Sequence, residues 1–350
     1  MPTIKYLLEN NAKIILMSHL GSPGGKTDEK LRLSPIQDKL TELLDLSVVK
    51  ANDCIGEEIE EWTKEMQIGE ILLLENLRFH AGEEENDEKF ASQLAKLGDI
   101  YVNDAFGVCH RAHASVSVIT KFIPPYAGLL LEKEIEILAK AIESPEKPLA
   151  VIIGGAKVLT KIKVIKKFLD IADNILLGGA LANTVLHAKG LAIGSSFIDK
   201  KAIEKIKEFE ITSAKLHLPV DAVVSTDKSG RAEARIEPIG KIGEKELILD
   251  IGPETEALFG EIVKAAKTVV WNGPMGLFET EKFSHGTKAI TLSIISCCCY
   301  SIIGGVETVA FINKNSWTDK FSHVSTGGWA MLKFLAGERL PGLETLERHE

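Results

Sequence analysis

The stretch LAVIIGGAKVLTK, which runs from Leu149 to Lys161, decides the fold of this chain. Its first five residues are apolar without alternation, as is typical of a parallel strand that is covered on both faces. The two glycines that follow allow a sharp turn at the carboxyl end of the strand. Lys157 and Lys161 then stand four residues apart, so they share one face of the helix that begins here. A strand end, a helix start and two cations suit a polyphosphate. The alternative is a glycine turn followed by solvated lysines.

The composition is that of a soluble globular protein. The chain has 350 residues, of which 45% are hydrophobic and 6% aromatic, enough for a large core and two domains. The formal net charge of -9 argues against nucleic acid as a partner, although it leaves room for a local basic pocket. No apolar stretch of about twenty residues could span a bilayer, and the first residues lack a signal core. We therefore expect a cytoplasmic protein without a membrane partner.

The five cysteines are Cys54, Cys109 and the run Cys297–Cys299. No CxxC pair occurs, and the spacing is not that of a secreted disulfide scaffold. A reducing cytoplasm is the default compartment for such a chain. Buried thiols in a helix, without a disulfide, are the simplest interpretation of the run.

The first residues predict the end of an amphipathic helix at Ile4–Asn10, followed by a strand at Lys13–Met17. A doubly wound domain usually begins with a strand, so we expect a segment to be missing upstream. The loop Ser18–Thr27 comes close to a P-loop, but Leu20 stands where the first glycine is needed. We reject the P-loop, although a glycine-rich loop at a strand end remains a suitable place for ligand contacts.

Two further strands are predicted at Ile71–Leu74 and Ile100–Val102, with a charged amphipathic helix at Glu83–Leu97 between them. Ser34 is predicted to cap another helix, with Pro35 at its first position. Both strands end in polar residues, ENLRF and NDAFG, where side chains can meet a ligand.

The cluster CHRAH follows at Cys109–His113. Cys109, His110 and His113 are a possible metal-binding set, but no partner pair with ligand spacing follows. We favour a basic pocket for an anion, built on Arg111. The alternative is a hydrogen-bonded loop that faces water.

A proline-containing linker at 144–148 follows a predicted helix at Glu132–Ile142. Domain boundaries lie in such linkers. We therefore assign residues 1–143 to a first domain and residues 144–335 to a second. Residues 336–350 are expected to return to the first domain.

The second domain repeats the pattern of apolar strands that end in glycine or polar turns. Such strands are predicted at Asn174–Leu177, Leu218–Val224, Thr268–Val270, Ser301–Ile303 and His323–Ser325. Alternating strands and helices indicate a doubly wound, parallel α/β sheet, whose ligands bind outside the carboxyl ends of the strands. The glycine turns would line one crevice there, which favours a nucleotide. No GxGxxG follows a strand, so a dinucleotide site and a dehydrogenase are poorly supported.

A series of short motifs carries a family resemblance and covers nearly the whole chain. In order they are SHLG at Ser18, ENLRF at Glu75, VNDAFG at Val102, HRAHAS at His110, GGAK at Gly154, LPVD at Leu218, DIGPET at Asp250, WNGPMGLFE at Trp271 and FSHVSTGG at Phe321. Together these segments resemble phosphoglycerate kinase. WNGPMG followed by FE is highly specific, whereas each short glycine turn alone is weak.

The resemblance implies an α/β fold of two doubly wound parallel-sheet, Rossmann-like domains joined by a hinge helix, the first lacking its opening strand. The amino-terminal domain would hold the phosphoglycerate, and the other domain would hold ATP or ADP with Mg²⁺. The implied reaction of glycolysis moves a phosphoryl group between 1,3-bisphosphoglycerate and ADP, giving 3-phosphoglycerate and ATP. Such chemistry needs positioning, charge neutralisation and exclusion of water. A monomer that closes around its substrates is also implied.

The resemblance also implies roles for particular residues. His19, Arg78 and Arg111 would bind the phosphoglycerate, and Arg78, Arg111, Lys157 and Lys161 would act in catalysis. Glu307 would hold the metal. Nucleotide contacts are implied for Lys157, Lys161, Gly179, Asn272, Glu279, Gly304, Gly305, Glu307, Thr308, Gly327 and Gly328.

Several residues depart from the family pattern. Ser22 stands for an arginine, Val306 and Glu307 stand for the glycine and aspartate of GGGDT, and Trp329 stands for the third glycine of STGGG. We expect Val306 to resist a positive φ and Trp329 to obstruct the phosphate. Since the loss of one transition-state donor slows a reaction about a hundred- to a thousandfold, a catalytically inactive nucleotide-binding remnant is the alternative function.

Overall fold

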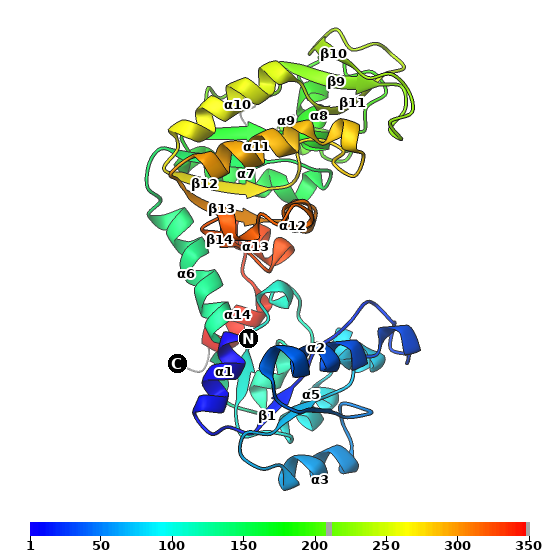
Figure 1. The fold of residues 1–350 in the computed structure, drawn as a ribbon, viewed down its shortest axis with the longest axis vertical. Helices are drawn as coiled ribbons and strands as arrows, with labels where there is room; N and C mark the ends of the chain where they lie inside the picture. The colour runs from blue at the N-terminus through cyan, green and yellow to red at the C-terminus, as the bar shows by residue number, and fades with distance from the viewer. Residues whose placement is uncertain (208–211, 348–350) are drawn as a thin grey trace. The chain divides into compact units, whose positions relative to one another are not determined.

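The computed structural model of the chain describes residues 1–207 and 212–347 (Figure 1). The chain divides into two compact units, Met1–Ile135 together with Arg339–Glu350, and Glu136–Glu338. The division lies inside helix α6 (Leu129–Glu143), ahead of the linker in which the sequence places the boundary. Helix α6 therefore belongs partly to each unit and connects them.

The first unit contains two parallel sheets. Three strands form one sheet in the order β1-β3-β2, and β4 pairs with β5 in the other. The central strand β3 is buried throughout, as expected for a parallel strand with neighbours on both sides. The strands are β1 (Ile14–Leu16), β2 (Val48–Lys50), β3 (Ile71–Leu73), β4 (Tyr101–Asn103) and β5 (Pro125–Ala127).

The helices of this unit differ from the sequence-based expectation at two places. The single helix predicted over Glu83–Leu97 is wrong: Asn86 adopts a φ of 57°, and Asp87 caps a new helix by accepting the N–H of Phe90 at 2.7 Å. Ser34 begins its helix without capping it. The helices are α1 (Pro2–Glu9), α2 (Ser34–Leu44), α3 (Glu57–Glu65), α4 (Ala81–Glu84) and α5 (Glu88–Ala95).

Short 3₁₀ helices connect many of these elements. In the first unit they are η1 (Glu29–Leu31), η2 (Leu77–Phe79), η3 (Phe106–Val108) and η4 (Val118–Lys121). The second unit contains η5 (Glu281–Phe283) and η6 (Thr318–Lys320).

The last helix, α14 (Pro341–Glu347), packs on β5 and η4 of the first unit. The N–H of Gly342 donates to the carbonyl of Cys109 at 3.0 Å. A Cβ on Gly342 would stand 2.9 Å from the Cα of Cys109, so glycine is needed for this close approach.

The second unit is built on a six-stranded parallel sheet in the order β14-β13-β12-β6-β7-β8. The strand predicted at Leu149–Ile153 is the central β6 and is buried throughout. The strand predicted at Asn174–Leu177 is β7. The remaining strands are β8 (Leu216–His217), β12 (Thr268–Asn272), β13 (Tyr300–Gly304) and β14 (His323–Val324).

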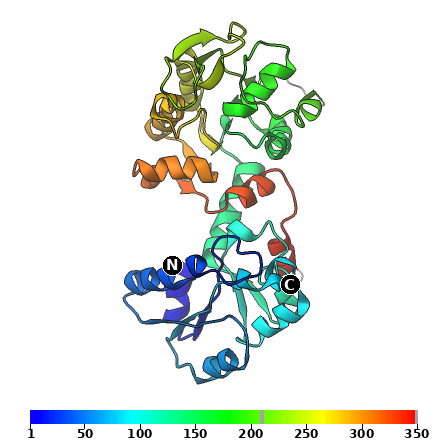
Figure 2. The same cartoon turned by 90° about the vertical axis from the view of Figure 1, so that its right-hand side faces the viewer.

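Helices cover both faces of this sheet, as a doubly wound fold requires (Figures 1 and 2). Helices α10, α11 and α12 join the core on one face, where Phe259, Ile290 and Ile312 pack with Trp271. Helix α7 lies against β6 and β7 and packs with α8, α9 and α13. The helices are α7 (Val158–Ile171), α8 (Gly179–Ala188), α9 (Ile203–Lys207), α10 (Pro253–Ala265), α11 (His285–Ser296), α12 (Val306–Lys314) and α13 (Gly328–Leu335).

A separate antiparallel sheet in the order β10-β9-β11 departs from the parallel pattern (Figure 1). The strand predicted at Leu218–Val224 begins only at β9 (Asp221–Ser225). The preceding Val220 N–H donates instead to the Thr255 hydroxyl at 3.0 Å. Strand β9 pairs with β10 (Arg235–Pro238) and β11 (Leu247–Ile251). The prediction that Leu218–Val224 is a strand of the parallel sheet was therefore wrong.

Candidate active site

The glycine turns of the second unit meet at the carboxyl edge of the six-stranded sheet. In the strand register, Asn272 lies beside Ile153 on one side and beside Gly304 on the other. The N–H of Gly155 donates to the carbonyl of Pro274 at 2.9 Å. Turns that are far apart in the sequence therefore form one continuous wall, as the parallel topology dictates.

Two glycines show why this wall excludes side chains. A Cβ on Gly154 would stand 2.0 Å from the carbonyl oxygen of Pro274. Gly155 adopts a φ of 76°, which residues with a Cβ rarely reach. The GG pair is thus fixed by backbone packing at a strand end.

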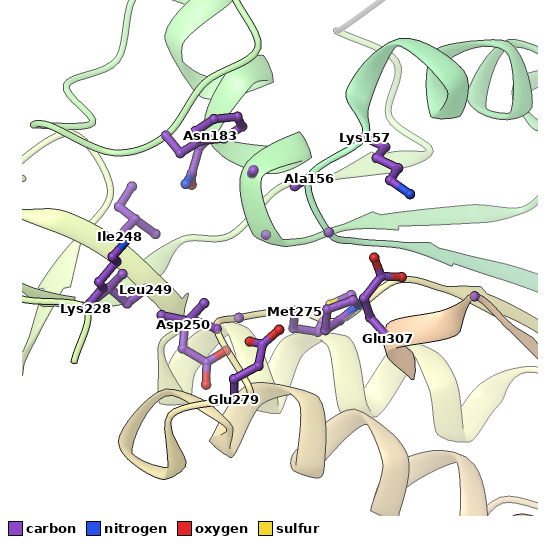
Figure 3. Close-up of a pocket in the computed structure, with 18 of the residues that line it drawn as sticks. Ala156, Lys157, Asn183, Lys228, Ile248, Leu249, Asp250, Met275, Glu279 and Glu307 are labelled. Carbon is purple, nitrogen blue, oxygen red and sulfur yellow. The ribbon is translucent and has the colours of Figure 1, made fainter. Parts of the chain in front are cut away.

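The wall borders a cavity of about 780 Å³ (Figure 3). Most of the residues expected to contact a nucleotide line it. These are Lys157, Lys161, Gly179, Asn272, Glu279, Gly305, Glu307 and Gly328. The cavity is large enough for a small-molecule ligand.

Lys161 is buried beneath the glycine turns, with 6% of its surface exposed. The pKa of its ammonium is lowered to about 8, chiefly by burial; the carboxylate of Glu307 opposes this shift, and the charge of Lys157 adds to it. The Lys161 Nζ donates to the carbonyl of Gly154. A Cβ on Gly273 would stand 2.6 Å from this Nζ, so glycine there leaves room for the cation.

Lys157 and Glu307 lie at the same end of the cavity. In Figure 3 the carboxylate of Glu307 points toward the ammonium of Lys157. The Nζ of Lys157 lies 4.4 Å from the ring centroid of Trp329, and Trp329 lines the cavity as well. Trp329, which was expected to obstruct the phosphate, therefore contacts Lys157.

Asn272 presents an unpaired donor in this wall. Only 4% of its surface is exposed, and its Nδ2 finds no hydrogen-bond partner in residues 1–207 and 212–347. A Cβ on Gly305 would stand 3.2 Å from this nitrogen. A buried amide in this position requires an acceptor, and an anionic ligand in the cavity can supply one.

Three residues assigned to the nucleotide by resemblance lie in the wall behind the cavity lining. The Oγ1 of Thr308 accepts the N–H of Gly273 at 2.8 Å. A Cβ on Gly304 would stand 2.1 Å from the sulfur of Met331. Gly327 donates its N–H to the Ser325 hydroxyl at 3.3 Å. Thr308 and Gly327 thus hold the turns by hydrogen bonds, and Gly304 allows Met331 to pack closely.

Val306, which was expected to resist a positive φ, stands where none is required. The positive φ, 96°, belongs to Gly305, and Val306 is the first residue of helix α12. Its side chain is 68% exposed. Valine adopts helical angles there without steric cost.

Several lining residues carried no assigned role in the sequence. Asp250 and Met275 lie in the motifs DIGPET and WNGPMGLFE, so the motifs were the available signal. Asn183 and Lys228 lie in segments without a motif. Asp250 is buried, which raises the pKa of its carboxyl to about 8, and it accepts the N–H of Gly286 at 2.8 Å.

The first unit gathers cationic side chains around His19. The pKa of this imidazole is lowered to about 4, chiefly by burial and in smaller part by the charges of Arg78, His113 and Arg111. Arg78 is 5% exposed and donates from Nη1 to the carbonyl of Gly21 at 2.7 Å. The three residues assigned to the phosphoglycerate thus lie close enough to interact, and a concentration of cations suits an anion.

A metal set of Cys109, His110 and His113 does not converge. Cys109 exchanges sulfur hydrogen bonds with Asn103 and Ala105, and His110 Nδ1 lies 2.9 Å from the carbonyl of Gly107. In the described parts of the chain, the one convergent group of this kind is Asp53, Cys54 and His80.

The Asp53, Cys54 and His80 group is already paired internally. The His80 Nε2 lies 2.6 Å from the Asp53 carboxylate. Burial, with the Asp53 charge, keeps the pKa of the Cys54 thiol far above its usual range. A metal would have to displace this contact and ionise that thiol.

The cysteine run was interpreted wrongly as buried thiols in a helix. A disulfide joins Cys297 to Cys299, and Cys298 is exposed. Helix α11 ends at Ser296, with Cys297 as its C-cap, so the run lies in the turn that leads into β13.

Fold and site together define an α/β protein of two units, with a ligand cavity at the carboxyl edge of a doubly wound sheet. The family model for phosphoglycerate kinase matches residues 1–338. The chain belongs to the phosphoglycerate kinase family and is therefore related to phosphotransferases.

Named relatives agree with this assignment. The phosphoglycerate kinase of Pelotomaculum thermopropionicum is 47% identical over 99% of this chain and 89% of its own length. That of Moorella thermoacetica is 46% identical with the same coverage.

Two solved structures share the fold. Phosphoglycerate kinase from Coxiella burnetii matches with a TM-score of 0.86 and 38% identity, covering 100% of this chain and 90% of the other. The enzyme from Pyrococcus horikoshii OT3 matches with a TM-score of 0.87 and 36% identity, covering 99% and 89%. Separately, the described helices include none with the length and apolar character that crossing a bilayer demands.

Proposed function

We propose that the chain catalyses reversible phosphoryl transfer between 1,3-bisphosphoglycerate and ADP, giving 3-phosphoglycerate and ATP. The observation that carries the proposal is the cavity at the sheet edge, where two lysines and an unpaired amide donor border glycine turns. Membership of the phosphoglycerate kinase family supports it. Neither the described residues nor the relatives favour the inactive remnant.

At one end of the cavity, which we call the charged end, lie Lys157 and Glu307 (Figure 3). At the other end, Ile248 and Leu249 supply apolar surface beside Lys228 and Asp250. We assign the base to the end with Ile248 and Leu249 and the phosphates to the charged end. Glu279, between the two, is placed to accept a hydrogen bond from a ribose hydroxyl.

The residues at the charged end fit Mg²⁺ through one carboxylate. Glu307 lines the cavity and makes no ion pair with any residue of the described ranges. Mg²⁺ is commonly held by one or two carboxylates together with phosphate oxygens and waters. When bound, the ion would neutralise charge on the phosphates, and Glu307 is the residue that would hold it.

The lysines and Asn272 provide the chain's own contribution. Phosphoryl transfer depends chiefly on positioning and on neutralising the charge of the transferring group. The Lys161 ammonium, held under the turns, and the Asn272 Nδ2 are already oriented before a ligand arrives. Such preorganised donors need no rearrangement during the reaction.

The first unit would bind the phosphoglycerate through His19, Arg78 and Arg111. Guanidinium groups bind phosphate in a bidentate manner that a lysine cannot reproduce. The lowered pKa of His19 keeps its imidazole neutral at pH 7, so it would donate a hydrogen bond without adding charge. Residues 1–143 with 336–350 would then form the phosphoglycerate domain, and residues 144–335 the nucleotide domain.

The remaining parts of the proposal concern the cell and the assembly. We propose a cytoplasmic monomer, with neither nucleic acid nor a membrane as partner, which closes around its substrates. The net charge of -9 supports the exclusion of nucleic acid.

Transfer from ATP to 3-phosphoglycerate in the presence of Mg²⁺, measured with the purified chain, tests the function. Lys161→Ala is the control, because it removes the buried ammonium. Turnover that is lost in the control would support the proposal. Turnover no higher than that of Lys161→Ala would overturn it.

A further inference from the structure

Trp329 offers an observation beyond the proposed reaction. It is the second residue of helix α13 and lies at the charged end of the cavity. The ammonium of Lys157 lies over its ring at 4.4 Å from the centroid. Tryptophan is the side chain whose ring attracts a cation most strongly.

Lys157 has an alternative partner close by. The carboxylate of Glu307 points toward it across the cavity (Figure 3), yet no ion pair joins the two in the described structure. Glutamate and lysine are both long and flexible side chains, and a surface pair of this kind gains little once side-chain entropy is included. The Trp329 ring is therefore able to compete with the Glu307 carboxylate for the Lys157 ammonium.

A pair between Lys157 and Glu307 would occupy both groups that the ligand needs. The phosphates require the lysine charge, and a divalent cation requires the carboxylate. Ligand binding would then have to break the pair first, which reduces apparent affinity by the fraction of molecules in which the pair is formed. A cation held on a ring keeps its charge and leaves the carboxylate available.

We propose that Trp329 is a positioning residue that holds Lys157 on its ring and thereby keeps Lys157 and Glu307 apart before a magnesium–nucleotide complex binds. The inference rests on the proposed function for the identity of the ligand. The positioning role itself concerns only Trp329, Lys157 and Glu307 and is testable without turnover.

The direct test is a crystal structure of ligand-free Trp329→Leu, which retains apolar bulk but removes the ring. We expect the Lys157 Nζ to move to about 2.7–3.0 Å from a Glu307 carboxylate oxygen, the usual length of a charged hydrogen bond. Lys157 that stays away from Glu307 in this variant would overturn the proposal.

Binding of MgADP, measured by titration calorimetry, gives a second readout. Trp329→Leu is expected to raise the Kd about three- to fivefold, the range of a partly exposed ion pair, and Trp329→Phe is expected to restore most of the loss. In a Glu307→Gln background, where the pair cannot form, Trp329→Leu should change the Kd for MgADP less than twofold. An equal loss in both backgrounds would contradict the proposal.

Trp317→Leu is the matched control. Trp317 is also half-buried and packs against the ring of Phe311, but it is not among the residues that line the cavity. This variant should leave the Kd unchanged. If the wild-type chain binds no MgADP at all, the proposed function fails, while the crystal structure of Trp329→Leu still decides the positioning role.

Discussion

The hydroxyl of Thr308 accepts the backbone N–H of Gly273 at 2.8 Å, and both residues are fully buried or nearly so. This bond ties the turn after β12 to the first turn of helix α12. It holds the turn in place behind the cavity lining. The Gly273 N–H has no access to water in this position, so it depends on the Thr308 hydroxyl as its acceptor.

Thr308→Val is expected to lower the free energy of unfolding by about 1–3 kcal/mol, since it leaves that N–H buried without a partner. Thr308→Ser retains the acceptor and should cost less. Urea unfolding of both variants measures the difference. Equal losses would show that the methyl group, rather than the hydrogen bond, matters.

Gly154→Ala should be severely destabilising, because its Cβ would stand 2.0 Å from the Pro274 carbonyl oxygen. We expect a loss of about 3 kcal/mol. Gly190→Ala is the matched control: Gly190 has a φ of 79° and no atom within 4 Å of an added Cβ, so only the backbone strain of about 1 kcal/mol applies. Thermal unfolding that ranks the two variants in the opposite order would refute this account of the wall.

Lys161→Met is expected to abolish turnover while making the fold more stable. Folding lowers the lysine pKa from 10.5 to about 8, so the unfolded chain binds more protons between these values. The free energy of unfolding of the wild type should therefore rise from pH 8 to pH 10.5, and at neutral pH the buried charge costs stability. Methionine removes that cost, and we expect a gain of about 1–2 kcal/mol at pH 7.

The same lysine predicts a pH dependence of ligand binding. Because the phosphates need the ammonium, the affinity of the wild type for nucleotide should weaken as the pH rises through about 8. Calorimetry at pH 7 and pH 9 measures this change, with Lys161→Met as the variant in which it should vanish. A dependence that survives in Lys161→Met would assign it to another group.

His19 predicts a loss of stability in acid. Its pKa is about 4 in the folded chain, against 6.5 for the ordinary side chain. The unfolded chain therefore binds more protons between pH 6.5 and pH 4, and the free energy of unfolding falls as the pH is lowered through this window. The slope from one such group is at most about 1.4 kcal/mol per pH unit.

His19→Asn is the comparison, because asparagine keeps a polar side chain that does not titrate. Its unfolding free energy should fall less than that of the wild type between pH 6.5 and pH 4. Parallel curves for the two proteins would show that His19 is not the group responsible.

Glu307→Gln should distinguish the contribution of the metal to binding from that of the nucleotide. The amide keeps the size of the side chain but loses the charge that a hard cation prefers. We expect the affinity for MgADP to drop about tenfold, while the affinity for ADP without metal changes little or improves. Titrations with and without Mg²⁺ measure both values, and an equal loss in the two would argue against a metal role for Glu307.

The sequence by itself determined the parallel sheet and its glycine-ended strands. Leu149–Ile153 and Asn174–Leu177 were located to the residue, because both are apolar apart from the partly exposed Asn174, as a strand covered on both faces requires, and the glycine that follows marks the end of each. Motif order determined the family. These features are local in the chain, so a local pattern is enough to reveal them.

Only the tertiary structure decided which groups meet across long sequence separations. It placed β9 in an antiparallel sheet with β10 and β11. It paired Thr308 with Gly273 and set Lys157 on the ring of Trp329.

The physical reason is that these outcomes are competitions between partners. Trp329 and Glu307 both lie near Lys157, and the N–H of Gly273 finds its acceptor in Thr308, 35 residues further along the chain. Their outcome depends on distance and burial in the folded chain, which spacing along the sequence does not encode.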